Sequence, residues 1–233
     1  SCGNIRVIYG EDSDITRNTI KGTTGDGNCD WDRYVLYARN CDGGDTVFVQ
    51  SNTISSIYGG DEQWHDILRT DCGSNFKIID NTITAAGITL GQGMFRFDSG
   101  LLDYYNNDLK VVSPGHNNGR TLITYGGGSG DTITFRSNTF DITNNTNLSA
   151  GSWRFLEHTS GPVFYFYKNT VNLTGLIRGV VLENVNGSIY NNTMVTTTGD
   201  YGLLLTGSDI KIKNNNLVGF TTSIHNDNST LNF

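Results

Sequence analysis

The chain has little proline, little charge and no long apolar run, and each shortage argues against a class of protein. Its 233 residues include only 2 Pro, and charged residues make up 17%. No window has the apolar spacing of an amphipathic helix, and no apolar stretch approaches the roughly 18 residues that a membrane-spanning helix needs. We therefore expect neither a helical fold nor membrane insertion.

Basic character is also scarce. The formal net charge is −7 and the sequence pI is about 4.9, whereas a nucleic-acid binder usually presents a basic face. We expect no nucleic-acid partner, although a local basic cluster is compatible with this charge. No signal peptide is recognisable. The sequence predicts a single domain over residues 1–233, either a mature domain or a piece of a longer chain.

The four cysteines, Cys2, Cys29, Cys41 and Cys72, show no CxxC pattern and no His-spaced metal pattern, so a zinc site is not expected. Disulfides formed in an oxidising compartment and buried free thiols both remain open. Cys41 and Cys72 occupy the same turn in successive repeats, where stacking would allow a disulfide. Cys2 and Cys29 would then be left to pair.

Glycine, with 29 residues, and the small polar residues Asn, Thr, Ser and Asp are abundant, which favours a β-rich protein with many turns. They also form a repeat. An Asn recurs every 23 to 34 residues, and the positions three before it and two after it are apolar in every copy. These residues are Asn18, Asn52, Asn81, Asn107, Asn138, Asn169, Asn192 and Asn215.

Each repeat contains a strand, a short Gly or Asp turn, a second strand, a bend at the Asn and a further short strand. The position two before the Asn varies in character, so it is expected to face outward in a period-2 strand. Asn suits a bend because its side chain bonds the backbone and tolerates left-handed geometry. Units this small cannot bury a face alone and must stack.

In these Asn and apolar columns the sequence resembles the right-handed parallel β-helix superfamily, which includes pectate lyases, polygalacturonases and the polysaccharide-processing tailspikes of phages. We expect an all-β, single-stranded, right-handed parallel β-helix of about nine coils with an internal Asn ladder that satisfies buried polar groups. The resemblance also implies a substrate groove beside the long loops, a polysaccharide partner and an extracellular location, either secreted or on a virion surface.

Aromatic and basic residues gather at the strand that follows the longest loops. Trp faces suit sugar stacking, and Arg suits carboxylate or sulfate groups. The alternative is that Trp covers the core and that Arg pairs with neighbouring Asp or Glu. The candidate substrate-binding residues are Trp31, Arg33, Trp64, His65, Arg69, Arg96, Arg120, Trp153, Arg154 and Arg178.

Carboxylates in the same strand are candidates for hydrolysis, which commonly needs two of them. Equivalent positions on neighbouring coils lie about 5 Å apart, so Glu157 with Glu183, or Asp71 with Asp98, is predicted to form an adjacent-coil pair. The alternative is a surface ladder of carboxylates balanced by Arg.

A lyase would instead need an Arg or a bound Ca²⁺ to neutralise a uronate, and a base to remove a proton. His65, His158 and Tyr125 are candidate bases. No compact acidic Ca²⁺ loop stands out, so metal ligands are unknown. No cofactor is expected unless a lyase reaction uses Ca²⁺.

The sequence thus predicts a protein that binds and degrades an extracellular polysaccharide, as a hydrolase or a lyase. The alternative interpretations are a non-catalytic glycan-binding or adhesion β-helix and a structural β-helix of a larger assembly. The sequence therefore does not decide whether the protein is an enzyme. Period 2 places Tyr105, Tyr165 and Tyr167 on the outside. There they would contact another chain in a homotrimer or stack on sugar.

Overall fold

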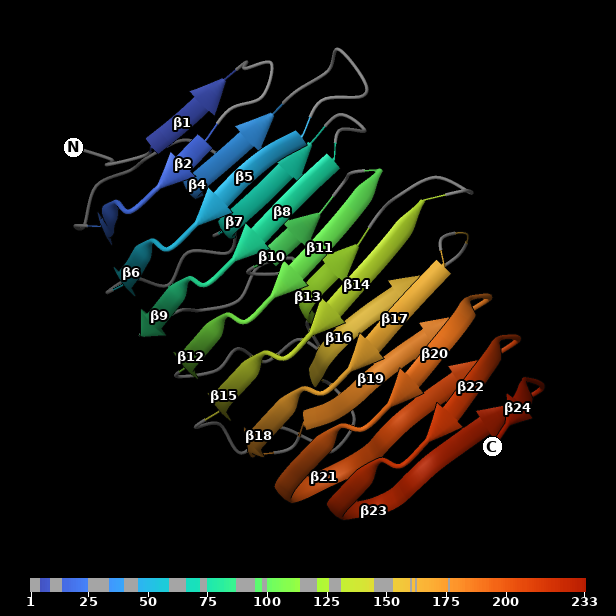
Figure 1. Ribbon diagram of the computed structural model, residues 1–233. Coiled ribbons are helices and arrows are strands. Elements are labelled where there is room, and N and C mark those ends of the chain that lie inside the picture. The colour runs from blue at the N-terminus through green and yellow to red at the C-terminus, as the bar shows by residue number, and fades with distance from the viewer. Residues whose placement is uncertain are drawn as a thin grey trace.

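The structure, a computed structural model, describes residues 5–8, 14–24, 34–39, 46–58, 66–71, 75–86, 95–97, 100–113, 121–125, 131–144, 153–159, 161, 163–175 and 177–233. All regular elements in these ranges are β-strands, and the paired strands among them are parallel. The strands stack as rungs from one end of the molecule to the other, with the two termini at opposite ends (Figure 1).

Each coil contributes one strand to each of three faces. Face A contains β1 (Ile5–Ile8), β4 (Tyr34–Arg39), β7 (Asp66–Asp71), β10 (Phe95–Phe97), β13 (Thr121–Tyr125), β16 (Trp153–Thr159) and β19 (Ile177–Glu183), and continues into the second halves of β21 (Thr193–Thr206) and β23 (Asn216–Asp227). Face B is the nine-stranded sheet of β2 (Asp14–Thr16), β5 (Thr46–Gln50), β8 (Asn75–Ile79), β11 (Leu101–Tyr105), β14 (Thr132–Arg136), β17 (Val163–Tyr167), β20 (Asn186–Tyr190), β22 (Asp209–Lys213) and β24 (Thr230–Asn232).

Face C contains β3 (Thr19–Thr24), β6 (Thr53–Tyr58), β9 (Thr82–Ala86), β12 (Asp108–Ser113), β15 (Thr139–Asn144) and β18 (Thr170–Thr174), and the first halves of β21 and β23 complete it. Because β21 and β23 run through the corner between faces C and A, these two faces form one 15-stranded sheet. The prediction of an all-β parallel β-helix is confirmed.

The prediction of about nine coils includes one coil that the structure shows to be incomplete. In the described residues, face B holds nine strands, β2 to β24, whereas face C holds eight, from β3 to β23. The coil that ends at β24 therefore lacks a strand on face C, and complete three-strand coils number eight.

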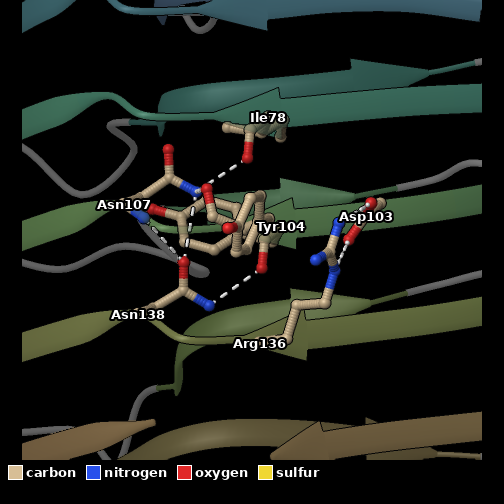
Figure 2. Close-up of polar contacts among 7 residues, drawn as sticks. Ile78, Asp103, Tyr104, Asn107, Arg136 and Asn138 are labelled. Carbon is tan, nitrogen blue, oxygen red and sulfur yellow. Dashed lines mark hydrogen bonds and ion pairs between the residues drawn. The ribbon is translucent and has the colours of Figure 1, made fainter. Parts of the chain in front are cut away.

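The Asn ladder is confirmed in its hydrogen bonds. In the middle of the stack, Asn107 donates from Nδ2 to Asn138 Oδ1 at 3.2 Å and to the Ile78 carbonyl at 2.7 Å. Its own Oδ1 accepts from the backbone N and from Nδ2 of Asn81, each at 2.9 Å. Figure 2 shows the amides of Asn107 and Asn138 in line across two coils. The ladder satisfies backbone groups that the bend would otherwise leave buried and unpaired.

The left-handed conformation does not lie where the sequence suggested. The residue that precedes each ladder Asn takes the positive φ, for example 55° at Asp80 and 53° at Asn106. The ladder Asn itself faces inward and bonds the next coil, because only an inward side chain can reach the amide above it. The bend therefore needs two residues, one to turn the backbone and one to fill the ladder.

The core lies between the three faces and includes the two predicted apolar columns. Seven residues three before the Asn are buried: Val49, Ile78, Tyr104, Phe135, Phe166, Ile189 and Ile212. So are seven residues two after it: Ile20, Ile54, Ile83, Leu109, Phe140, Val171 and Met194. The remaining member of each column, Ile15 and Leu217, lies in the first or the last complete coil and is partly buried.

Candidate functional site

In several strands of face A, two consecutive inward residues bring polar side chains together on the outside. In β16, Phe155 and Leu156 are 0% and 1% exposed, so two consecutive residues face the core. A regular strand alternates faces at every residue, and this doublet shifts the alternation by one. As a result Arg154 and Glu157, three residues apart, both project from the outer face.

The same doublet recurs in other strands of face A, where both members are buried: Val35–Leu36 in β4, Ile67–Leu68 in β7 and Leu122–Ile123 in β13. The doublets set the register between coils, since Ile123 pairs with Leu156. Thr121 pairs directly with Arg154, and Arg154 with Arg178 on the following strand. Polar positions just before the doublet therefore lie one above another.

Seven residues form what we call the polar stripe, which crosses β13, β16, β19, β21 and β23 on the outer side of face A. Its members are Thr121, Arg154, Glu157, Arg178, Asp200, Tyr201 and His225. The strand bounds show where the stripe begins. The connections from face C to face A span 25–33, 59–65, 87–94, 114–120 and 145–152 in the earlier coils, and shrink to 175–176 before β19. The polar stripe therefore begins on the last strands that follow long connections, β13 and β16, and continues on strands of the coils after them.

Glu157 is the most constrained carboxylate of the stripe. Thr121 donates a hydrogen bond to its Oε2 at 2.6 Å, and Arg154 Nη1 donates to its Oε1. Burial disfavours the ionised form and by itself would raise the pKa of Glu157. The hydrogen bonds from Arg154 and Thr121, together with the charge of Arg154, outweigh burial and hold that pKa below its ordinary value. Glu157 is therefore ionised at neutral pH.

Arg178 joins the second half of the stripe. Its Nε lies 3.4 Å from Asp200 Oδ2, and its guanidinium carbon lies 5.2 Å from the centre of the Tyr201 ring. The Tyr201 ring in turn lies 4.9 Å from the His225 ring. The stripe thus alternates cations, carboxylates and rings, and the two Arg and two acidic residues balance in charge.

The predicted pairing of Glu157 with Glu183 is wrong in register. Glu157 lies beside Val181, and Glu183 lies beside Thr159, two residues further along the strand. In β19 the first doublet position is taken by Gly179, where a Cβ would lie 2.2 Å from the carbonyl oxygen of Gly202. Aligning the two segments by sequence pairs Glu157 with Glu183, whereas in the structure the paired positions differ by two residues.

The candidate bases in the described residues point into the core. His158 is 1% exposed, with its ring 6.0 Å from that of Phe164 and 5.2 Å from that of Tyr125. Tyr125 is also buried and donates to the Gly100 carbonyl at 3.4 Å. Although His158 follows Glu157 in the chain, the two side chains lie on opposite sides of the sheet.

The arginines do not occupy one repeating slot. Arg69 and Arg96 pair directly with each other and, through Thr124, align with Glu157. Arg154 and Arg178 form a separate column before the doublet. Both columns face outward, so the structure brings four of the predicted binding arginines to face A.

Several predicted site residues are described in part or lie outside the described residues. For Asp71 and Trp153 the backbone is described within β7 and β16, but the side chains are not. The remaining residues in this group, with the four cysteines, are Trp31, Arg33, Trp64, His65, Asp98 and Arg120.

Sequence reasoning missed Thr121, Asp200, Tyr201 and His225. Tyr201 could have been found, because it precedes Gly202 and Leu203 just as Arg154 precedes Phe155 and Leu156. The signal was the position relative to the doublet, rather than the residue type.

Tyr105, Tyr165 and Tyr167 on face B are outward, as predicted, but Tyr105 and Tyr167 each have a ring face in contact with another side chain. The Tyr167 and Tyr190 rings stack at 4.8 Å with an interplanar angle of 3°, and the guanidinium of Arg136 lies 3.8 Å from the centre of the Tyr105 ring. Sugar stacking needs an open ring face. Of these tyrosines Tyr165 is the most exposed, at 36%, and it remains the best candidate for an external contact.

Among the described residues no three His, Cys, Asp or Glu side chains are grouped so that they could hold a metal ion. The same part of the chain contains no helix long and apolar enough to cross a membrane. Comparison with family models, curated proteins and solved structures finds no match for this chain.

Proposed function

We propose that this chain binds an extracellular polysaccharide along the polar stripe of face A. The observation that carries the proposal is the alignment of Arg154 and Arg178 at directly paired positions of consecutive strands, with Tyr201 beside Arg178. Such an array offers hydrogen-bonding groups at the strand spacing of about 4.8 Å. A linear polymer can engage several of them at once, whereas a small ligand cannot.

The chemistry of the stripe suits sugar. Arginine supplies several hydrogen-bond donors and carboxylates supply acceptors, and sugar hydroxyls use both. Tyr201 adds an aromatic ring next to Arg178. Because the stripe itself is balanced in charge, it suits a hydroxyl-rich ligand, and the neighbouring Arg69 and Arg96 would favour one that also carries carboxylate or sulfate groups.

Degradation of the bound polysaccharide is the second candidate. Hydrolysis would need a protonated carboxylic acid with a raised pKa beside a second carboxylate. The pKa of Glu157 moves in the opposite direction, and Glu183 is not its neighbour. Glu157 fits the role of an ionised partner of Arg154, so binding is better supported by the stripe than cleavage.

The biological setting follows from the resemblance to β-helix proteins that process polysaccharides. A secreted protein or a virion-surface component of tailspike type fits it, and a homotrimer in contact through face B would place Tyr165 at the interface. Light scattering of the purified chain would test the trimer. The acidic net charge supports the absence of a nucleic-acid partner.

Affinity electrophoresis in gels that contain dextran, polygalacturonate or heparin tests the proposal. The wild-type chain is expected to be retarded by at least one polymer, and Arg178→Ala and Tyr201→Ala are expected to reduce the retardation. Lys110→Ala and Lys211→Ala are matched controls, since both lysines are exposed on other faces. Retardation by none of the polymers, or equal loss in the lysine controls, would refute binding at the stripe.

The same polymers separate binder from enzyme. A hydrolase would release reducing ends, and a lyase would give a product with the absorbance of an unsaturated uronate. Retardation without either product would leave the chain as a binding protein.

A further inference from the structure

Three side chains at the start of the polar stripe form a chain of hydrogen bonds across two coils. Thr121 on β13 donates to Glu157 Oε2 at 2.6 Å, and Arg154 on β16 donates to the other oxygen of the same carboxylate. Thr121 and Arg154 are also directly paired along the strands. Each oxygen of Glu157 therefore has its own donor, one from each coil.

The three residues differ in how much surface they offer. Thr121 is 6% exposed, so its hydroxyl is covered and cannot reach a polymer on the surface. The side chain of Glu157 is 21% exposed, and that of Arg154 is 37% exposed. Of the three, Arg154 is the group best placed to meet a ligand, while Thr121 lies behind it.

Arg154 needs an external restraint to hold one orientation. A free arginine side chain samples many rotamers, and the neighbour of Arg154 on the following strand is the like-charged Arg178. The directly paired neighbours of Glu157 are Thr124 and Val181, which carry no charge. The described contacts that fix the Glu157 carboxylate are therefore those with Arg154 and Thr121.

We propose that Thr121 is a positioning residue for polysaccharide binding: its hydroxyl fixes the carboxylate of Glu157, which in turn holds the guanidinium of Arg154 toward the ligand. This inference rests on the proposed function of the stripe. It adds a determinant that never touches the polymer, and it makes the affinity of one coil depend on a hydroxyl group of the coil before it.

The same contacts give a readout that does not involve ligand. They hold the pKa of Glu157 below its ordinary value against the opposing effect of burial. Loss of the Thr121 hydroxyl removes one of these contacts, so the pKa of Glu157 should rise. Because burial also raises this pKa, the hydroxyl must be removed by a substitution that keeps the shape of the side chain.

The test compares Thr121→Val, which keeps the shape and removes the hydroxyl, with Thr121→Ser, which restores it. In the ligand-free chain, NMR would follow the titration of the Glu157 carboxyl carbon and the Nε–H signal of Arg154. We expect Thr121→Val to raise the pKa of Glu157 and to broaden or shift the Arg154 signal. Thr121→Ser should resemble the wild type in both measurements.

Affinity for dextran, polygalacturonate and heparin is then measured for the same variants. The loss of one hydrogen bond to a charged group should weaken binding of the retarding polymer by roughly tenfold in Thr121→Val. Thr121→Ser should recover it to within about twofold. If Thr121→Val proves unfolded by circular dichroism, Glu157→Gln tests the same link, because a neutral amide holds Arg154 less firmly and should also weaken binding.

The outcomes distinguish the two proposals. If the wild type binds none of the polymers, the proposed function fails, and positioning for glycan fails with it, whatever the NMR titration shows. If the wild type binds but Thr121→Val changes neither affinity nor the Glu157 titration, only the positioning role is overturned. It is also overturned if Thr121→Ser behaves like Thr121→Val, because the methyl group and not the hydroxyl would then be responsible.

Discussion

The guanidinium of Arg136 lies over the ring of Tyr105, with its central carbon 3.8 Å from the ring centre, and is held there by Asp103. Arg136 Nε donates to Asp103 Oδ1 at 2.9 Å, and Nη2 donates to Oδ2 at 2.8 Å. Figure 2 shows this pair on the outside of face B, on the opposite side of the sheet from Tyr104 and the Asn ladder. The contact links strands β11 and β14, which belong to two consecutive coils.

Arg136→Ala should therefore weaken the stack of coils. A fork-shaped ion pair that is 30% and 28% exposed at its two side chains contributes little more than a surface pair, and the ring contact adds a similar amount, so the expected loss is about 1 kcal/mol. Urea unfolding of Arg136→Ala, Asp103→Ala and the double variant would give the coupling energy. Arg136→Lys should not restore stability, because a lysine neither forks onto a carboxylate nor stacks flat. Additive single losses would contradict the coupling.

Tyr104 presents the opposite case, a polar atom where the core offers no partner. The ring is 1% exposed and packs against Phe135 and Phe140, and its buried hydroxyl has no hydrogen-bond partner among the described residues. Burial raises the pKa of this phenol far above its ordinary value. Tyr104→Phe removes the unsatisfied hydroxyl and should stabilise the fold by about 1 kcal/mol. Thermal and urea unfolding would measure it.

Tyr165→Phe serves as the control for Tyr104→Phe. Tyr165 is on the outer side of face B and 36% exposed, so loss of its hydroxyl should change stability by less than about 0.5 kcal/mol. A clear loss of stability in Tyr104→Phe would show that its hydroxyl has a partner after all.

The repeat was predictable because one side-chain type performs one physical task in every coil. An Asn at the bend must satisfy the same buried backbone groups each time, and the apolar residues around it must fill the same interior. The identities of Asn81, Asn107 and their apolar neighbours therefore carry the register of faces B and C. No comparable requirement fixes the residue identity on the outer side of a strand, where many polar residues are tolerated.

The register of face A was harder to predict for a related reason. Its marker is a pair of consecutive inward residues, and one of these positions can be glycine, as at Gly179 and Gly202. Counting by simple alternation then fails. Matching Glu157 to Glu183 by the apolar residues before each misplaces the strand by two residues. Thr121 was missed because threonine is common throughout the chain and only the fold shows that its hydroxyl meets a carboxylate.

Asn107→Ala should be strongly destabilising. The substitution leaves the Ile78 carbonyl without its 2.7 Å donor, and it removes the acceptor shared by the backbone N and Nδ2 of Asn81. Buried groups left unpaired cost roughly 1–3 kcal/mol each, so we expect a loss of about 3 kcal/mol in urea unfolding.

The end of the ladder supplies the control for Asn107→Ala. Asn18 is exposed, and its backbone N keeps its bond to Asn52 Oδ1 when the side chain is removed. Asn18→Ala should cost less than about 1 kcal/mol. Equal losses at Asn18 and Asn107 would mean that burial does not set the strength of the ladder.

The ion pair of Glu157 predicts how stability responds to acid. Its contacts with Arg154 and Thr121 place the folded-state pKa below the ordinary value of 4.5, so between the two pKa values the unfolded chain binds more protons than the folded chain. The stabilisation is therefore fully present above about pH 4.5 and is lost as the pH falls through the folded-state pKa. Urea unfolding of the wild type and Glu157→Gln from pH 7 to pH 3 should show a constant difference near neutrality that shrinks below about pH 4.5. Added salt should reduce the neutral-pH difference, because the pair is partly exposed. A difference that stays constant down to pH 3 would indicate that Glu157 keeps no such contacts in solution.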